Sequence, residues 1–399
     1  MIVLQLLKIA TKNLRIVITK MIYVDAAASA LKPRAVIDAE IDFLSNKYAN
    51  SGRGICMRAT NVDKLIQKTR KTTVNFLNAK SADQIIFTNG TTDGLNRIAK
   101  ILDNSRIKYL CDKSVILVSD LDHHAARMPF EELGRRNECN IKVAKLDDNF
   151  NIIAEKCDIF VITAMSNVLG NAQDVKKIIK NAKTLNPNVI TIVDAAQYVA
   201  HLPIDASDWD PDFLCFSGHK IGSDTGVGVM YIKNPERWYP DKFGGGMISS
   251  IDGDNWIFSE SPEKFEAGTL ALTQIIGLDA AIKELKIPDI NVEKLTKTLQ
   301  LELGKNKRIK FLTNNYLKLN PYLTSFTIDD MNPLDFGILI GTHDICLRIG
   351  HMCASWIHKK LEITGSIRIS LGPWNTELEI EQLIKIISQI TNLNSQHKS

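Results

Sequence analysis

The chain has 399 residues, of which 45% are hydrophobic and 24% are charged, with 49 Lys and Arg against 45 Asp and Glu. A chain with so many apolar residues is expected to form a hydrophobic core, which excludes a disordered protein. At roughly 150 residues per domain, the length predicts two domains. The net charge of +4 is small and the basic residues are dispersed, so we expect no nucleic-acid partner, which would need clustered Lys and Arg.

The first residues, 1–20, carry four basic side chains and no acidic one. Their apolar stretch, Ile2–Ala10, is interrupted by Gln5 and Lys8, so it is too short and too polar to span a membrane, and it lacks the features of a secretory signal. Three interpretations stay open: an organellar presequence, an extra helix or strand that packs on the body of the protein, or translation that starts at Met21. No other run reaches the roughly 18 apolar residues of a membrane span. We expect a soluble cytoplasmic protein with no membrane partner.

From about residue 85 to 232, short apolar runs alternate with helix-period segments such as Asp174–Ala182. The runs are Ile85–Thr88, Val115–Ser119, Ile141–Ala144, Ile159–Thr163, Val189–Asp194, Phe213–Ser217 and Val227–Ile232. This alternation is typical of an α/β fold, a mostly parallel sheet flanked by helices. Ligands in such sheets bind at the carboxyl ends of the strands.

The last third of the chain has a different pattern. Residues 233–270 are rich in Gly, Pro, Trp and Ser and are expected to form loops. Beyond them we expect helices at Gln274–Leu285 and Val292–Leu303, strands near Leu323–Ile328 and Ser366–Leu371, and a final helix from about Thr376. We therefore predict a large domain over 35–275 and a smaller α+β domain over 276–399, joined by about 1–34.

Three of the predicted strand ends carry polar groups. Gly90 and two threonines follow the first run, where a helix N-terminus would bind a phosphate or would simply be capped by a threonine hydroxyl. Asp194 ends an apolar strand, where a carboxylate needs a cation. Lys220 follows another strand, where burial would lower its pKa and make it nucleophilic. Together these groups indicate pyridoxal phosphate chemistry.

The seven cysteines lie at 56, 111, 139, 157, 215, 346 and 353 and include no Cys-x-x-Cys pair. Neither a disulfide framework nor a thiolate metal site is expected, and a reducing compartment fits the odd number. Cys111, Cys157 and Cys215 lie within or beside apolar runs and are interpreted as packing residues.

Nine short motifs in a fixed order identify a family resemblance over almost the whole chain. They are GTTDG, DHHA, SNVLG, VDAAQ, FSGHK, TGVGVMY, FEAGT, RIGHMCA and IRISLG. The sequence resembles the class V aminotransferase-like, fold-type I pyridoxal-phosphate enzymes. Within them it is most similar to the cysteine desulfurases of the sulfur-mobilisation group (group II), which are close to selenocysteine lyases.

The resemblance implies a role for each matching residue. Lys220 would bind the cofactor as a Schiff base, Asp194 would pair with its pyridine nitrogen, and His123 would stack on its ring. Phosphate would be held by Thr91, Thr92, Ser217 and His219, with Thr269 reaching it from the second subunit of a homodimer. Asn167 and Gln197 would lie against the cofactor and Asn167 also against the substrate, whose carboxylate Arg368 would bind.

The same resemblance singles out Cys353 as the nucleophile. The implied reaction converts L-cysteine to L-alanine and leaves a persulfide on Cys353, with Lys220 moving the α-proton. The sulfur would pass to an acceptor protein and supply iron–sulfur cluster assembly. No metal site is expected.

The match also departs from the family pattern. Cys56 replaces a histidine, Ile221-Gly222-Ser223-Asp224 replaces a loop with an aromatic residue, Gly and Pro, and Ala126 replaces an asparagine. In the nucleophile loop Ile349 replaces a threonine and Met352 a second histidine. Alternatives therefore stay open: a selenocysteine lyase, a transaminase, or a divergent pyridoxal-phosphate-binding scaffold or sulfur-relay homologue.

Overall fold

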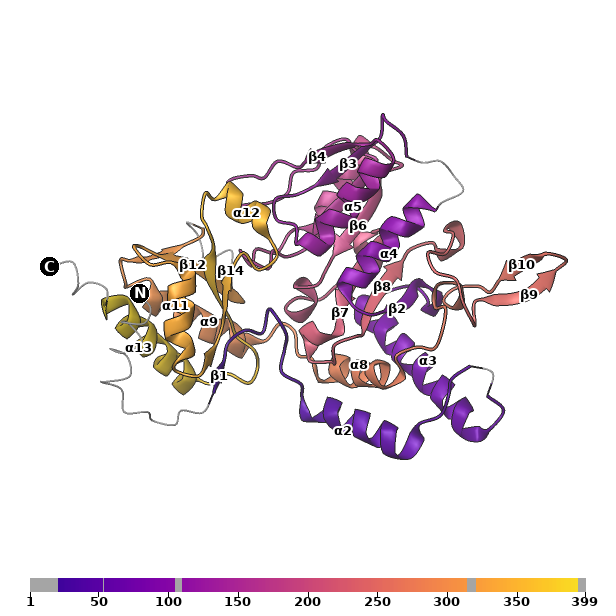
Figure 1. Ribbon diagram of the computed structural model, residues 1–399, viewed down its shortest axis with the longest axis horizontal. Coiled ribbons are helices and arrows are strands. Elements are labelled where there is room, and N and C mark those ends of the chain that lie inside the picture. Colours follow the sequence, from indigo (N-terminus) through magenta and orange to yellow (C-terminus); the bar gives the residue numbers. More distant parts are fainter. Residues whose placement is uncertain (1–20, 53, 105–109, 314–320, 394–399) are drawn as a thin grey trace.

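The computed structural model describes residues 21–52, 54–104, 110–313 and 321–393, so the expectations for residues 1–20 lie outside it. Helices and sheets form two bodies, a large one and a small one (Figure 1). Among the helices of these ranges, none is long and apolar enough to cross a membrane.

The strands predicted between residues 85 and 232 form one sheet in the large body. They are β2 (Ile85–Thr88), β3 (Val115–Val118), β4 (Asn140–Val143), β5 (Ile159–Thr163), β6 (Ile190–Asp194), β7 (Phe213–Ser217) and β8 (Gly228–Ile232). The sheet order is β2-β8-β7-β6-β5-β3-β4, and β4, β3, β5, β6 and β7 run parallel. Only β8 is antiparallel to its two neighbours. The predicted α/β class with a mostly parallel sheet is confirmed.

Both faces of this sheet are covered because its central strands are apolar on both sides. One face packs on α4 (Thr91–Asp103) and α5 (His124–Arg136). The opposite face packs on α3 (Met57–Leu77), α6 (Val175–Leu185) and α8 (Leu272–Glu284). Further helices are α2 (Arg34–Asp42) and α7 (Ala206–Trp209), and short helical turns are η1 (Phe43–Lys47), η2 (Ala82–Gln84), η3 (Tyr198–Ala200), η4 (Gly218–Ile221), η5 (Pro235–Arg237) and η6 (Glu263–Phe265).

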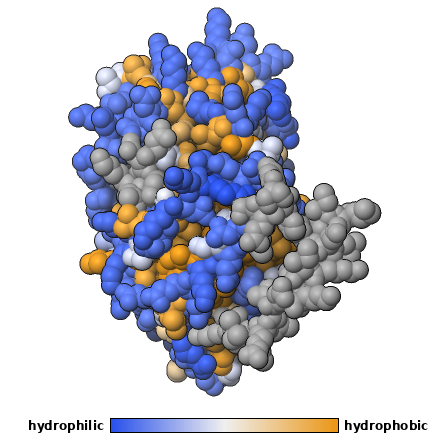
Figure 2. Space-filling model, turned by 90° about the vertical axis from the view of Figure 1, so that its left-hand side faces the viewer, coloured by the Kyte–Doolittle hydropathy of each residue, from blue (hydrophilic) through white to orange (hydrophobic). Residues whose placement is uncertain are grey.

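The small body holds a second, antiparallel sheet. Its strands are β11 (Ile309–Phe311), β12 (Leu323–Ile328), β14 (Arg348–Gly350) and β15 (Ser366–Ser370), in the order β11-β12-β15-β14. Helices α9 (Ile290–Leu303), α11 (Pro333–Gly341), α12 (Ser355–Lys360) and α13 (Glu377–Leu393) accompany it. The N-terminal strand β1 (Ile22–Tyr23) pairs in parallel with β13 (Ile345–Cys346). Figure 2 faces this body, where apolar patches lie between hydrophilic side chains.

Two expectations from the sequence are wrong. The loop predicted over 233–270 contains the hairpin of β9 (Ile248–Asp252) and β10 (Asn255–Phe258). Most of its residues are exposed, so no buried face gives the segment an apolar alternation. Cys111 is exposed rather than packed, whereas Cys157 and Cys215 are buried as predicted.

Helix α8 spans the predicted domain boundary at 275/276. It packs on α2 and α3, and its residues Ile275, Leu278 and Ala281 belong to the core cluster of the large sheet. We therefore propose that the large domain continues to the end of α8 and that the small domain begins after it.

Candidate active site

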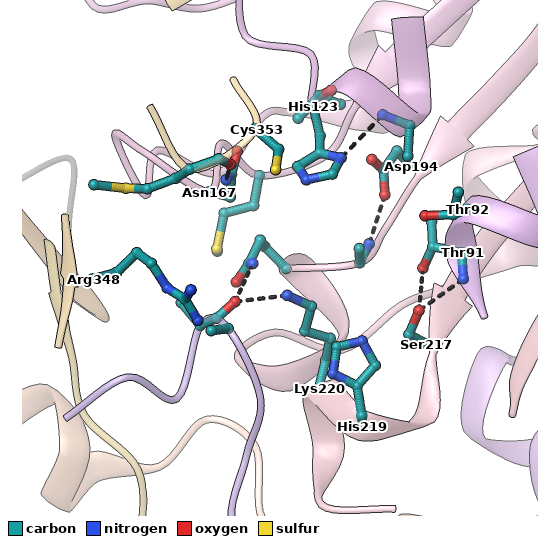
Figure 3. Close-up of a pocket in the computed structure, with 18 of the residues that line it drawn as sticks. Thr91, Thr92, His123, Asn167, Asp194, Ser217, His219, Lys220, Arg348 and Cys353 are labelled. Atoms are coloured by element: carbon teal, nitrogen blue, oxygen red, sulfur yellow. Dashed lines mark hydrogen bonds between the residues drawn. The ribbon is translucent and has the colours of Figure 1, made fainter. Parts of the chain in front are cut away.

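A cavity of about 290 Å³ lies where the ends of β6 and β7 meet β14, β15 and the segment before α12 (Figure 3). Nearly all of the residues singled out from the sequence line it together. They are Thr91, Thr92, His123, Asn167, Asp194, Gln197, Ser217, His219, Lys220, Cys353 and Arg368. The convergence follows from the topology, because the carboxyl ends of parallel strands meet at one edge of a sheet.

At one end of the cavity, the N-terminus of α4 meets the end of β7. Gly90 precedes the helix with a φ of 129°, in a region that favours glycine. The Thr91 backbone N–H donates to Ser217 Oγ at 2.7 Å, and the Thr91 hydroxyl lies 2.8 Å from the same oxygen. Hydroxyls grouped at the positive end of a helix are suited to an anion such as a phosphate.

Asp194 is the last residue of β6 and is 5% exposed. Its Oδ1 accepts a hydrogen bond from the Ala196 backbone N–H at 2.9 Å. Burial raises the pKa of Asp194 to about 6, while this hydrogen bond and the charge of Lys220 pull the pKa down. A buried carboxylate with a raised pKa gains most from a cationic partner, such as a protonated ring nitrogen.

Lys220 lies on η4, directly after β7. Its Nζ donates to the Ala27 carbonyl oxygen at 2.6 Å, and Gln197 Nε2 donates to the same oxygen at 2.7 Å. Burial and the charge of Arg368 lower the pKa of Lys220 to about 8, against the opposing effect of Asp194. The amine therefore loses its proton far more readily than an exposed lysine does.

Two imidazoles in the cavity are held neutral. His123 caps α5, and its Nδ1 accepts from the Ala125 backbone N–H at 3.1 Å, so the neutral ring carries its proton on Nε2. Burial, and then the charge of Lys220, lowers the pKa of His123 to about 4, and the same two causes lower the pKa of His219 to about 4.

The opposite wall carries two guanidinium groups that share one carboxylate. Arg368 is 2% exposed, and its Nη2 lies 3.0 Å from Asp25 Oδ1. Arg348 Nη2 lies 2.8 Å from Asp25 Oδ2. Arg368 also donates to the Asn167 carbonyl oxygen at 2.8 Å. Arg348 lines the cavity as well, so a carboxylate entering it meets two cations.

Cys353 lies between β14 and α12, beside His123 and Asn167 in Figure 3. It is exposed. Met352 has a φ of 52° and Cys353 a φ of 55°, both in the left-handed region that costs about 1–2 kcal/mol per non-glycine residue. Asn167 Nδ2 donates to the Met352 carbonyl oxygen at 2.8 Å, while the buried Asn167 Oδ1 has no hydrogen-bond partner among the described residues.

Thr269 is the one predicted site residue that the cavity does not include. It is exposed and lines a separate depression together with Asp63, Arg70 and Glu266. Two residues of the wall, Asp25 and Arg348, were missed from the sequence. Both stand in matching segments, YVDAAA and RIGHMCA, and the position of Arg348 five residues before the nucleophile was the available signal.

The residues that depart from the family pattern differ in how deeply they are buried. Cys56 caps α3, where its Sγ accepts from the Ala59 N–H at 3.5 Å, and it is exposed. Asp224 pairs with Lys32 at 3.6 Å. Ala126 is fully buried, and Met352 lines the cavity. Within the described residues, no group of three or more His, Cys, Asp or Glu side chains is arranged to hold a metal ion.

Comparisons with known proteins agree on one family. Residues 22–383 match the family model described as aminotransferase class-V. The chain is 32% identical over 388 residues to a cysteine desulfurase of Wigglesworthia glossinidia brevipalpis, covering 93% of this chain and 92% of that one. It is 34% identical over 397 residues to a probable cysteine desulfurase of Borreliella burgdorferi, with the same coverages. The apo structure of a cysteine desulfurase from Thermococcus onnurineus NA1 superposes with a TM-score of 0.87 at 28% identity, covering 93% of this chain and 95% of that one.

Proposed function

Since the chain belongs to the aminotransferase class-V family and is a cysteine desulfurase, we propose that it converts L-cysteine to L-alanine and accepts the sulfur on Cys353. The observation that carries this assignment is the meeting of Cys353, Lys220 and Asp194 in one cavity, which the Arg348 and Arg368 guanidinium groups also line. We further propose that the persulfide passes to an acceptor protein for iron–sulfur cluster assembly.

Enzymes of this family depend in general on pyridoxal 5'-phosphate, and the residues present fit that group. Lys220 would hold it, Asp194 would face its ring nitrogen, and His123 would lie against its ring. The hydroxyls of Thr91, Thr92 and Ser217, with His219, would hold its phosphate, and the unpartnered Asn167 Oδ1 and the nearby Gln197 would lie against its ring substituents. When bound, pyridoxal phosphate supplies an electron sink for the bonds at the substrate's α-carbon.

The chain's own groups then have distinct tasks. Arg368 binds the substrate carboxylate, in a pairing that suits a planar guanidinium. The Lys220 amine takes up the proton of the α-carbon and returns it, which its pKa of about 8 permits near neutral pH. The Cys353 thiolate attacks the substrate sulfur, so that an S–S bond forms as the substrate's C–S bond breaks. L-cysteine and one thiol thus yield L-alanine and one persulfide, without an added oxidant or reductant.

Cys353→Ala in the holoenzyme tests this assignment. We expect the variant to keep the absorbance of the bound cofactor and to lose alanine and sulfide production measured with L-cysteine and a reductant. Cys111→Ala is the matched control, because Cys111 is also exposed but lies before β3, outside the cavity lining. Sulfide release by Cys353→Ala at the wild-type rate would contradict the assignment, and alanine formation that requires a 2-oxo acid would indicate transamination instead.

We also propose that the enzyme works as a homodimer in which Thr269 contacts the cofactor phosphate of the second subunit. The exposed position of Thr269, outside the cavity of its own subunit, supports this proposal. So does the exposed hairpin of β9 and β10, which carries Ile251 and Trp256 on its surface.

A further inference from the structure

We propose that His124 is a positioning residue that fastens the Cys353 loop of the small domain to α5 of the large domain, and thereby sets the rate of sulfur transfer. The proposal rests on the role of Cys353 proposed above. It concerns the second histidine of the DHHA motif, which the family resemblance leaves without a role, and a contact between residues 231 positions apart in the chain.

His124 contacts the loop on both sides of Ala354. Its backbone N–H donates to the Cys353 carbonyl oxygen at 2.7 Å. Its Nε2 accepts from the Ser355 backbone N–H at 3.3 Å and lies 3.1 Å from the Ser355 hydroxyl. A backbone N–H acts only as a donor, so this contact requires the imidazole to leave Nε2 unprotonated.

Further contacts join α5 and the segment before it to α12. The His124 ring meets the Trp356 ring edge to face, with centroids 5.0 Å apart and an interplanar angle of 82°. The Arg127 guanidinium lies 4.2 Å from the Trp356 ring centroid. Asp120 lies 3.6 Å from Arg127 and 3.5 Å from Lys360, so one carboxylate bridges α5 and α12. Helix α12 is therefore attached along its length to the start of α5 (Figure 1).

The Cys353 loop needs such an attachment because its own backbone is strained. Met352 and Cys353 both have positive φ angles, and Cys353 is exposed. A loop in this state keeps one conformation only where the surrounding structure determines it. Further contacts from the large domain include the Asn167 amide on the Met352 carbonyl and the packing of Met352 and Ala354 on its core cluster. Without the His124 side chain, the loop keeps its backbone hydrogen bond to residue 124 but loses the contacts to Ser355 and Trp356, so the thiol is held less firmly in the cavity.

The experiment compares His124→Ala with His124→Gln in the holoenzyme. Glutamine places an amide oxygen near the position of Nε2, and that oxygen accepts the Ser355 N–H, whereas alanine leaves this donor unpaired. We expect His124→Ala to lower kcat for alanine formation about tenfold with less than a twofold change in KM for L-cysteine. We expect His124→Gln to recover most of the loss. His343→Gln, a histidine of the small domain outside the cavity lining, is the matched control and should behave as wild type.

A second measurement follows the loop itself. Iodoacetamide should alkylate Cys353 several-fold faster in His124→Ala than in the wild type, because the loosened loop lets the thiol move out of the cavity lining, with sites quantified by mass spectrometry. Trp356→Leu, which removes the ring contact only, should give a smaller increase and serves if His124→Ala does not fold.

Unchanged alkylation together with a lower kcat would overturn the proposal, because His124 would then act on the chemistry and not on the loop. Equal losses in His124→Ala and His124→Gln would also overturn it. The alkylation rates are read without turnover, so they test the attachment even if the wild-type enzyme releases no alanine from L-cysteine. That last result would contradict the proposed function alone.

Discussion

The two sides of the cavity are built in opposite ways. One side, which we call the floor, comes from the ends of β6 and β7 and includes Asp194, Ser217 and Lys220, of which the first two are buried. The other side, which we call the wall, comes from the small domain and includes Arg348 and Cys353. The Arg348 side chain is 48% exposed. The function of the floor groups therefore depends on pKa values that burial has shifted. The function of the wall groups depends on the positions in which their neighbours hold them.

This difference assigns different sensitivities to the two sides. On the floor, the pKa of Asp194 is raised to about 6 and that of Lys220 is lowered to about 8, so a neutral substitution removes a charge that burial made costly. The wall groups are held in place by Asp25 and by His124 of the large domain, so a substitution of either residue changes geometry more than chemistry.

The largest loss is expected from Lys220→Ala on the floor. Removal of the amine takes away both the group that would hold the cofactor and the group that moves the α-proton, and general acid–base catalysis alone is worth roughly 10²–10⁴ in rate. We expect alanine formation to fall by about 10³ or more, measured in single-turnover assays. The protein should still fold, because Nζ has its bond to the Ala27 carbonyl in a cavity and not in the core. Activity above a tenth of the wild-type value would show that the floor does not do the proton transfer.

A smaller loss of activity, with a gain of stability, is expected from Asp194→Asn. The folded pKa of Asp194, about 6, lies above the unfolded value of 3.8, so the folded state binds the proton more tightly. The contribution of Asp194 to the free energy of unfolding therefore falls as the pH rises from about 4 through 6. Without cofactor, Asp194→Asn should be more stable than the wild type at pH 8 by about 2 kcal/mol and about equal at pH 4.

With cofactor, the same variant should lose roughly 10² in kcat, since the ring nitrogen lacks its anionic partner. Urea unfolding of the cofactor-free protein at pH 4 and pH 8 measures the difference in stability, and the rate of alanine formation by the holoenzyme measures the loss in kcat. An apo-protein that is less stable at pH 8 than the wild type would contradict the burial argument.

Sequence reasoning predicted the floor far better than the wall. The central strands of the large sheet are buried on both faces, so each is a continuous apolar run, and the residues after these runs lie at one common edge. The polar ends of those runs, Asp194 and Lys220, were therefore visible at once. The hairpin of β9 and β10 gave no such signal because its residues are exposed.

The contacts that build the wall are formed between segments far apart in the chain. Asp25 and Arg368 are separated by 343 residues, and His124 and Ser355 by 231. No periodicity or local motif connects such pairs, since each pair is formed only when segments far apart in the chain meet in the folded protein. The nucleophile was found through its motif, but not the residues that hold it.

Asp25→Asn tests the wall and should raise KM for L-cysteine moderately. The substitution keeps the size of the side chain and removes the charge that Arg348 and Arg368 share. Because Arg368 is almost fully buried, losing its counter-charge costs it both orientation and solvation. We expect KM for L-cysteine to rise roughly tenfold with a smaller change in kcat. Asp329→Asn is the matched control, because its ion pair with Lys310 is exposed on both sides and contributes little. A loss in kcat with unchanged KM would place Asp25 in the chemistry and break the distinction between the two sides.

The smallest effect on activity is expected from His201→Phe, at a contact between the two domains. His201 follows η3 of the large domain and stacks on Tyr322 of the small domain, with centroids 4.7 Å apart and an interplanar angle of 16°. Burial, and then the charge of Lys220, lowers the pKa of His201 from 6.5 to about 4. Below pH 6.5, His201 is therefore protonated in the unfolded chain but stays neutral in the folded protein. The free energy of unfolding consequently decreases as the pH falls from 6.5 towards 4.

Phenylalanine keeps the stack and cannot titrate, so the variant should gain about 2 kcal/mol over the wild type at pH 5 relative to pH 7.5. Urea unfolding at the two pH values measures this difference, and turnover at pH 7.5 should stay within twofold of the wild type. The other imidazoles whose pKa burial lowers, His123, His219 and His358 among them, titrate equally in both proteins and cancel in the comparison. A difference that does not change between pH 7.5 and 5 would mean that His201 contributes by packing alone, and that the link between the domains is insensitive to acid.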